Sequence, residues 1–295
     1  MTLGLRYAML GIVLIAPAVM IFGAVIVYPL VSAVYSSLFA IDTPTLQGHW
    51  VGFGNYVTLL QSRQFWAALY QNAVWTVGTV TLQLLLGVAT ALLLNTRILF
   101  RSLARSLILF PYFVSSVVAV LIWRWLFNDL YGILNHALMD AEIIDMPLDW
   151  LGQMPNAMIS VILVGTWKHF PFVVIAVLAR LQTIPPQLYE AAAMDGATAW
   201  GRFCDVTLPQ LRDVLAIVVL LRTIWDFKEF DIIFLMTGGG PLGKTQTIPL
   251  LVYQQAFGLN QMGMASATAV VMMALMLVFI AIYLSRSGES RQVSQ

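Results

Sequence analysis

The sequence predicts an all-α membrane protein with six transmembrane helices, and composition and hydropathy carry that prediction. Of its 295 residues, 60% are hydrophobic and 10% are charged, whereas a soluble globular domain carries roughly 25% charged residues. The mean hydropathy is +0.85. Apolar runs long enough to cross a bilayer, about 18 residues or more, recur along the chain. No basic stripe indicates nucleic-acid binding, and a lone cysteine, Cys204, excludes an internal disulfide or a cysteine metal cluster.

The first apolar run, 7–39, is too long for one perpendicular helix across a core of about 30 Å. It is expected to tilt, or to bend near Tyr28-Pro29, where proline removes a backbone donor. Although Ala16-Pro17-Ala18 imitates a signal cleavage site, the run far exceeds a signal's roughly 7–15 apolar residues, so we expect an uncleaved span. The remaining spans of a single domain, 1–295, are expected at 66–94, 107–127, 157–180, 211–236 and 264–284.

Basic residues fall mostly on one side of these six spans, together with both termini. They are Arg6, Arg97, Arg101, Arg105, Arg180, Arg202, Arg212, Arg286 and Arg291. The opposite loops hold Arg63, Lys244 and an acidic cluster within 128–149. Because cytoplasmic loops are enriched in Lys and Arg, this predicts a multi-pass protein with both termini, and the segment 181–210, in the cytoplasm.

The segment 190–209, EAAAMDGATAWGRFCDVTLP, is a polar interval between two strongly apolar ones. Prolines before it are expected to stop one helix and start the next, whose early Glu190 would suit a helix N-terminus. Asp195-Gly196 is expected to end this short helix. Thr198 would cap a second one, which Pro209 would stop before the fifth span. For Glu-Ala-Ala alone, the simpler interpretation is an alanine-rich helix selected for propensity.

The longer frame is more specific: Glu190-Ala191-Ala192, then Gly196, then Val206-Thr207-Leu208-Pro209. It resembles the EAA loop in the membrane subunits of binding-protein-dependent ABC importers, with Val206 where isoleucine is commoner. The resemblance implies that the first short helix is a coupling helix in a cleft of a separate ATPase subunit. Glu190 would pair with a basic residue of the ATPase and Gly196 would give the turn. The coupling residues implied are Glu190, Ala191, Ala192, Asp195, Gly196 and Pro209.

Motifs elsewhere are similar to carbohydrate permeases of the maltose and glycerol-phosphate type. They are Ala16-Pro17-Ala18, Tyr28-Pro29-Leu30, Gly52-Phe53-Gly54-Asn55-Tyr56, Thr237-Gly238-Gly239-Gly240-Pro241 and Tyr253 with Ala256-Phe257. This resemblance implies the type I importer fold and half of a path for a sugar, oligosaccharide, polyol or sugar-phosphate-like solute. The chain departs from the maltose subunit in lacking extra N-terminal spans and a large inserted periplasmic domain.

The implied assembly lies in a bacterial or archaeal cytoplasmic membrane. Its partners are a second, distinct homologous permease, two ATPase subunits, and a periplasmic or extracellular solute-binding protein. The resemblance implies no cofactor in this chain, since ATP and magnesium would be bound by the ATPase subunits.

Residues 238–245 satisfy the phosphate-loop pattern GxxxxGK[ST]. A phosphate loop joins a strand to a helix within an α/β domain, whereas this segment joins two spans on the predicted outer side. We interpret the match as coincidental, and as a family turn instead. No nucleophile, base and acid set accompanies it, so we expect no enzymatic activity.

Charged residues inside the spans are the remaining signal, because they are costly there and usually face a protein interior or a polar path. Arg222, Asp226 and Glu229 share one helical face, with aromatic residues alongside that suit a sugar. Either these charges pair with one another, or they line the path. The candidate path residues are Trp225, Asp226, Phe227, Lys228, Glu229, Lys168 and His169. The rival class, an ion-coupled secondary transporter, would show two similar halves with broken helices, which the sequence does not; a non-sugar solute also stays open.

Overall fold

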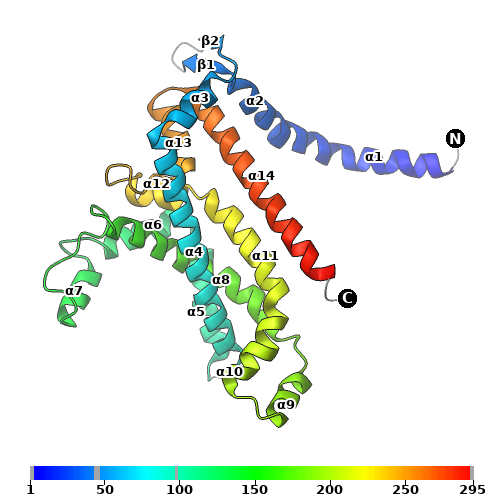
Figure 1. Ribbon diagram of the computed structural model, residues 1–295, viewed down its shortest axis with the longest axis vertical. Helices are drawn as coiled ribbons and strands as arrows, with labels where there is room; N and C mark the ends of the chain where they lie inside the picture. The colour runs from blue at the N-terminus through cyan, green and yellow to red at the C-terminus, as the bar shows by residue number, and fades with distance from the viewer. Residues whose placement is uncertain (1–2, 43–46, 97–98, 293–295) are drawn as a thin grey trace. The chain divides into compact units, whose positions relative to one another are not determined.

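The computed structural model describes residues 3–42, 47–96 and 99–292, which form helices and one two-stranded sheet (Figure 1). Arg97, counted above among the cytoplasmic basic residues, lies outside the described part. The chain divides into two compact units, 1–65 with 251–275 and 66–250 with 276–295. Each unit has its own internal packing.

The first unit begins with a long helix that contains a π-helical turn near its proline. α1 (Leu3–Phe22) continues through a π-helical turn, Gly23–Val27, into α2 (Tyr28–Ser36). The N–H of Tyr28 bonds to the carbonyl of Gly23, five residues back. Proline lacks an N–H, and its ring collides with the carbonyl four residues back in an α-helix, so the wider turn accommodates Pro29. The predicted irregularity near Tyr28-Pro29 therefore takes the form of a π turn.

Beyond α2 the chain forms a hairpin and a short helix, where the predicted turn motif 52–56 has a structural role. The elements are β1 (Phe39–Asp42), β2 (Gln47–Trp50), antiparallel to β1, and α3 (Gly54–Gln61). The Asn55 amide donates to the carbonyls of Ser37 (2.8 Å) and Phe39 (2.9 Å). A Cβ at Gly263 would overlap the Phe39 carbonyl. Asn55 thus connects the end of α2 to β1 by hydrogen bonds. Gly263 lies beside these atoms, where a larger residue would not fit.

The second unit holds most of the remaining helices. They are α4 (Arg63–Asn95), α5 (Arg101–Phe113), α6 (Ser116–Leu126), α7 (Ile133–Asp140), α8 (Asn156–Leu181), α9 (Pro186–Met194), α10 (Ala199–Arg202), a π turn (Phe203–Thr207), α11 (Leu208–Phe227) and α12 (Asp231–Thr237). α13 (Ile248–Tyr253), a π turn (Gln254–Gly258) and α14 (Met262–Gln292) complete the chain. α4, α13 and α14 each contribute residues to both units.

α8 is the central helix of the second unit, packing against α5, α11, α12 and α6. α4 also approaches it closely, because glycines replace side chains at the contact. A Cβ at Gly165 would collide with the Trp75 ring, and one at Gly87 would lie 2.5 Å from the Val173 Cβ. Small residues of this kind let membrane helices approach one another without a large hydrophobic driving force.

Four helical segments within the described residues are long and apolar enough to cross a membrane, or five if the bent α5–α6 pair counts as one span. They are Gly11–Ser36, Arg63–Asn95, Asn156–Leu181 and Met262–Arg286. The first ends before residue 39 of the predicted span 7–39, since Phe39 already belongs to β1. α7 lies between the predicted third and fourth spans.

Two predicted spans differ from the structure. The third, 107–127, is not one helix: α5 and α6 meet at 100°, around Val114 in an extended conformation. The fifth, 211–236, breaks at 228–230 into α11 and α12. α11 is not among the four apolar spans, and it carries four charged residues, Arg212, Asp213, Arg222 and Asp226. The fourth span is continuous, since α8 runs through the buried Pro171. Packed neighbours let membrane helices retain an internal proline.

Candidate functional site

The segment 186–209 forms a short helix, a glycine turn and a second helical start at one end of the second unit (Figure 1). α9 begins at Pro186, as predicted, and ends where Gly196 adopts φ +81°. The predicted Thr198 cap is confirmed, since its Oγ1 accepts from the Gly201 N–H at 3.1 Å. Two other expectations need correction. Glu190 lies in the second turn of α9 rather than the first. Pro209 does not stop a helix, because the π turn 203–207 leads directly into α11, with Pro209 in its first turn.

Side-chain bonds join the end of α8 to the start of α11, and α9 to the π turn before α11. The Arg180 guanidinium on α8 donates to the Gln210 carbonyl (2.9 Å) and to its side-chain oxygen (2.7 Å). The Tyr189 hydroxyl on α9 bonds to Thr207 Oγ1 at 3.1 Å. Tyr189 also packs against the apolar cluster that contains Leu181. α9 is therefore bonded to the turn that leads into α11, and it packs against an apolar cluster formed by α8 and α11.

The opposite face of α9 is open. Glu190, Ala191, Asp195, Gly196 and Pro209 are exposed, while Ala192 is half-buried. The helix thus presents one carboxylate and small side chains outward, which is the surface that close docking by another protein requires.

Large apolar side chains beside this surface were missed by the sequence reasoning. Met194 is 89% exposed and Trp200 is 72% exposed. Neighbouring exposed apolar side chains of this size typically mark an interaction site. The signal was a tryptophan within a polar segment predicted to face the cytoplasm.

A buried polar cluster lies toward the other end of α11. Arg222 (2% exposed) and Asp226 (1% exposed) form an ion pair across one helical turn. Arg222 Nε also donates to Gln83 Oε1 on α4 at 2.6 Å. His169 Nδ1 on α8 lies 4.0 Å from Asp226 Oδ1. Three helices thus contribute to one polar centre.

Backbone bonds fix the C-terminal end of α11 beside this cluster. Trp75 Nε1 donates to the Asp226 carbonyl at 2.8 Å, and the Asn72 amide donates to the Phe227 carbonyl at 3.2 Å. Asn72 Oδ1 in turn accepts from the Ile248 N–H at 3.2 Å. Carbonyls at a helix end lack full helical partners, so α4 adds donors to two of them, of which the Asp226 carbonyl also accepts from the Glu229 N–H.

Of the other candidate path residues, some form hydrogen bonds at helix ends and others keep part of their surface exposed. Lys168 Nζ donates to the Val114 carbonyl between α5 and α6 at 2.5 Å, and Glu229 Oε1 accepts from the Ile232 N–H at the start of α12. Trp225 packs edge-on against Phe172 at 5.0 Å. Lys228 is exposed, and Trp225 and Phe227 are half-buried. The structure brings Asp226 and His169 together and gives Lys168 and Glu229 helix-end partners.

The segment 238–245 follows helix α12 rather than a strand, and the next helix, α13, starts three residues after it. Gly238, Gly239 and Gly243 have positive φ. Thr245 Oγ1 donates to the Gly240 carbonyl at 2.6 Å and lies 2.7 Å from Thr237 Oγ1. In a phosphate loop the corresponding hydroxyl binds Mg²⁺; here it closes a compact turn.

Comparison with known proteins finds relatives of similar length. The trehalose/maltose transport system permease protein MalF of Thermococcus litoralis is 35% identical over 279 residues, covering 95% of this chain and 94% of its own. The inner membrane ABC transporter permease protein YcjO of Escherichia coli is 36% identical, covering 94% and 92%. The sulfoquinovosyl glycerol transport system permease protein SmoG of Agrobacterium fabrum is 35% identical, covering 94% and 89%.

The fold is shared with a solved importer. The crystal structure of a bacterial ABC transporter involved in the import of the acidic polysaccharide alginate matches with a TM-score of 0.81 at 23% identity, covering 99% of this chain and 96% of that one. This confirms the all-α, type I importer permease fold. Residues 83–285 match the family described as binding-protein-dependent transport system inner membrane component. The chain belongs to that family of inner-membrane transport components.

Proposed function

We propose that the chain is one of two permease subunits in an ATP-driven importer for a sugar, oligosaccharide, polyol or sugar-phosphate-like solute. The observation that carries the proposal is the open face of α9, a helix that Tyr189 bonds to the turn leading into α11. Family membership and relatives named for trehalose, maltose and sulfoquinovosyl glycerol transport support it. The maltose-named relative is matched over 94% of its length, so the lack of an inserted domain is no argument against an α-glucoside.

In this mechanism α9 is the coupling helix and two separate ATPase subunits, with ATP and magnesium, supply the energy. This chain binds no nucleotide and catalyses no reaction. α11 has 20 residues, and at about 1.5 Å per residue it is roughly 30 Å long. Because Tyr189 bonds α9 to the π turn before α11, and Arg180 bonds α8 to α11, a displacement of α9 would move the far end of α11 beside Asp226. Such a shared rigid element can switch the path between inward- and outward-facing states.

The solute path would use the candidate residues that are at least partly exposed, namely Trp225, Phe227 and Lys228. Asp226 and His169 add buried polar atoms beside these side chains, with His169 Nδ1 4.0 Å from Asp226 Oδ1. Aromatic faces with hydrogen-bonding groups suit a carbohydrate. Arg222 and Asp226 serve mainly to fix helix positions.

The partners are a distinct second permease, the two ATPases and an external solute-binding protein, in a bacterial or archaeal cytoplasmic membrane. A related alginate importer was solved with a periplasmic binding protein, which supports the last of these. The arginine distribution supports cytoplasmic termini.

The test is ATP hydrolysis by the complete complex in liposomes, measured with a panel of sugars, polyols and non-sugar solutes presented by the binding protein. A sugar-class solute should stimulate hydrolysis and appear inside the vesicles. Stimulation only by a non-sugar solute would refute the solute class. Uptake by this chain alone on an ion gradient, without ATPase subunits, would refute the importer mechanism and favour a secondary transporter.

A further inference from the structure

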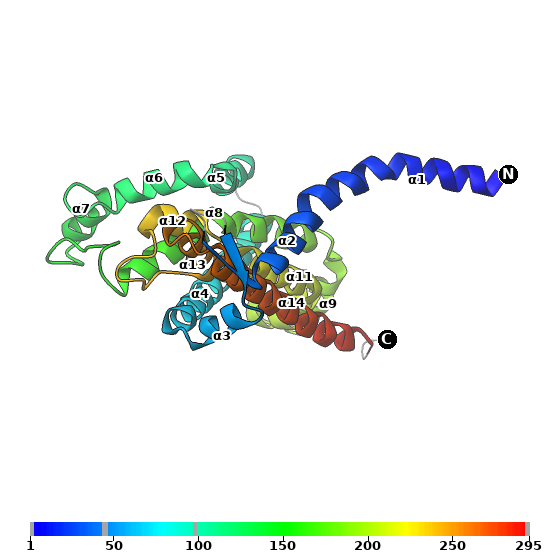
Figure 2. The same ribbon diagram turned by 90° about the horizontal axis from the view of Figure 1, so that it is seen from above.

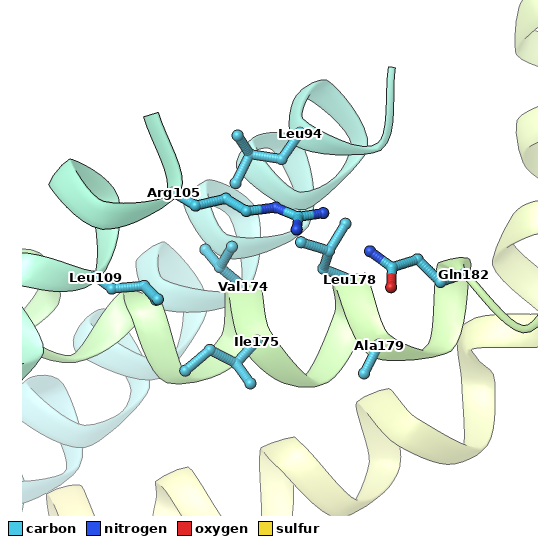
Figure 3. A pocket seen from close by; sticks show the side chains of 8 residues that line it. All are labelled: Leu94, Arg105, Leu109, Val174, Ile175, Leu178, Ala179 and Gln182. Atoms are coloured by element: carbon cyan, nitrogen blue, oxygen red, sulfur yellow. The ribbon is translucent and has the colours of Figure 1, made fainter. Parts of the chain in front are cut away.

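An apolar cavity of about 220 Å³ lies between α4, α5 and α8, away from both sites described above. It is lined by Leu94, Arg105, Leu109, Val174, Ile175, Leu178, Ala179 and Gln182. Figure 3 shows the Arg105 side chain reaching across the cavity from α5 toward Leu178 and Gln182. The lining is hydrocarbon apart from one guanidinium and one amide.

The polar and apolar parts of this cavity are separated along the helices. Arg105 lies one turn into α5, and Gln182 caps the C-terminal end of α8. Leu109 is one turn further along α5, and Val174 is two turns back along α8, about 12 Å from Gln182 at 1.5 Å per residue. Since α8 is an apolar span, its end marks the membrane boundary, and the cavity runs from that boundary into the hydrocarbon.

The charge at the polar end is unbalanced. α4, α5 and α8 contain no Asp or Glu. Arg105 Nε is buried and has no hydrogen-bond partner among the described residues, and the same holds for Arg101 Nε one turn earlier. Arg180, by contrast, is bonded to Gln210. A buried guanidinium N–H without an acceptor is costly, so this end suits an anion.

We propose that this cavity binds an anionic phospholipid of the surrounding membrane, with the phosphate at Arg105 and one acyl chain against Leu109, Val174 and Ile175. The volume supports a chain segment, because it falls below the roughly 300–1,000 Å³ of whole small-molecule pockets yet exceeds the about 150 Å³ of an apolar cavity that holds benzene. Basic pockets between transmembrane helices bind anionic headgroups in this way. A bound lipid would join α4, α5 and α8 at the end of the unit that carries α9.

Native mass spectrometry of the full chain, with the subunits that copurify, tests the site by titration with dioleoyl phosphatidylglycerol or dioleoyl phosphatidylcholine. The wild type should prefer phosphatidylglycerol. Arg105→Ala should weaken that preference about fivefold, which corresponds to roughly 1 kcal/mol per basic residue at an anionic surface. Ile175→Trp, at a side chain 46% exposed, should fill the cavity and weaken both lipids. Arg212→Ala, which removes an exposed arginine on α11, should bind like the wild type.

Equal lipid preference in Arg105→Ala and Arg212→Ala would overturn the proposal, as would unchanged binding in Ile175→Trp. Displacement of the lipid by millimolar inorganic phosphate would point to a free anion and overturn the lipid assignment. Loss of lipid binding on assembly with the second permease would also overturn the proposal, because a protein helix would then cover the cavity. Thermal unfolding of each variant in detergent serves as the folding control, because a variant that melts like the wild type reports on binding alone.

Discussion

The Arg222–Asp226 pair provides the sharpest test of whether these charges hold the structure or contact the solute. Asp226→Ala leaves Arg222, 2% exposed, with Gln83 as its remaining side-chain hydrogen-bond partner among those found in the described residues. Removing one member of a buried ion pair typically costs about 3–5 kcal/mol, because the other charge stays buried. At roughly 2–4 °C per kcal/mol for a unit of this size, the melting temperature should fall by about 6–20 °C.

The matched control is the double variant Arg222→Met/Asp226→Leu. Replacing a buried pair with apolar side chains of similar size is often neutral or stabilising, so this variant should regain most of the lost stability. The assay is thermal unfolding of the purified full chain in detergent, followed by fluorescence-detected size exclusion, with uptake measured in the complex. If Asp226→Ala melts within 2 °C of the wild type but abolishes uptake, the pair serves the path and our structural interpretation is wrong.

Three further predictions concern α9 and helix packing. Glu190→Lys should detach or uncouple the ATPase, measured by copurification and ATP-driven uptake, because it reverses the charge on the open face of α9. Gly196→Ala should cost about 1–2 kcal/mol, since a Cβ there meets nothing within 4 Å but φ is +81°; hydrogen exchange across 186–200 measures it. Gly165→Ala should cost about 1–3 kcal/mol through overlap with the Trp75 ring, measured as thermal unfolding.

Each of these has a control on the same kind of element. Gln187→Lys adds a charge one turn before Glu190 on the same exposed face of α9 but keeps the carboxylate, so equal loss of the ATPase in both lysine variants would argue against a specific role for Glu190. Gly201→Ala meets its nearest atom at 3.5 Å with ordinary φ, and exchange rates equal to those of Gly196→Ala would contradict the turn argument. Gly11→Ala meets nothing within 4 Å; a similar loss of stability there would refute close α4–α8 packing.

Much of the fold was predictable because hydropathy is a local property. The second and fourth predicted spans end within three residues of α4 and α8, and the Gly196 turn and the Thr198 cap follow from residue chemistry within a few positions. The breaks within 107–127 and 211–236 were not predictable from apolar content. They depend on partners distant in sequence, such as Lys168 on the Val114 carbonyl and Trp75 on the Asp226 carbonyl.

The sequence by itself predicted an all-α membrane permease, which the comparisons with known proteins confirm, and indicated 190–209 as a segment for a partner, since composition, span length and motif spacing depend on neighbouring residues. Only the tertiary structure decided how the charges divide. Arg222 pairs with Asp226 and bonds to Gln83. Lys168 and Glu229 bond to backbone groups at helix ends, and Lys228 is exposed. A charge inside a membrane must find a partner or water, and the identity of that partner depends on which helices pack together.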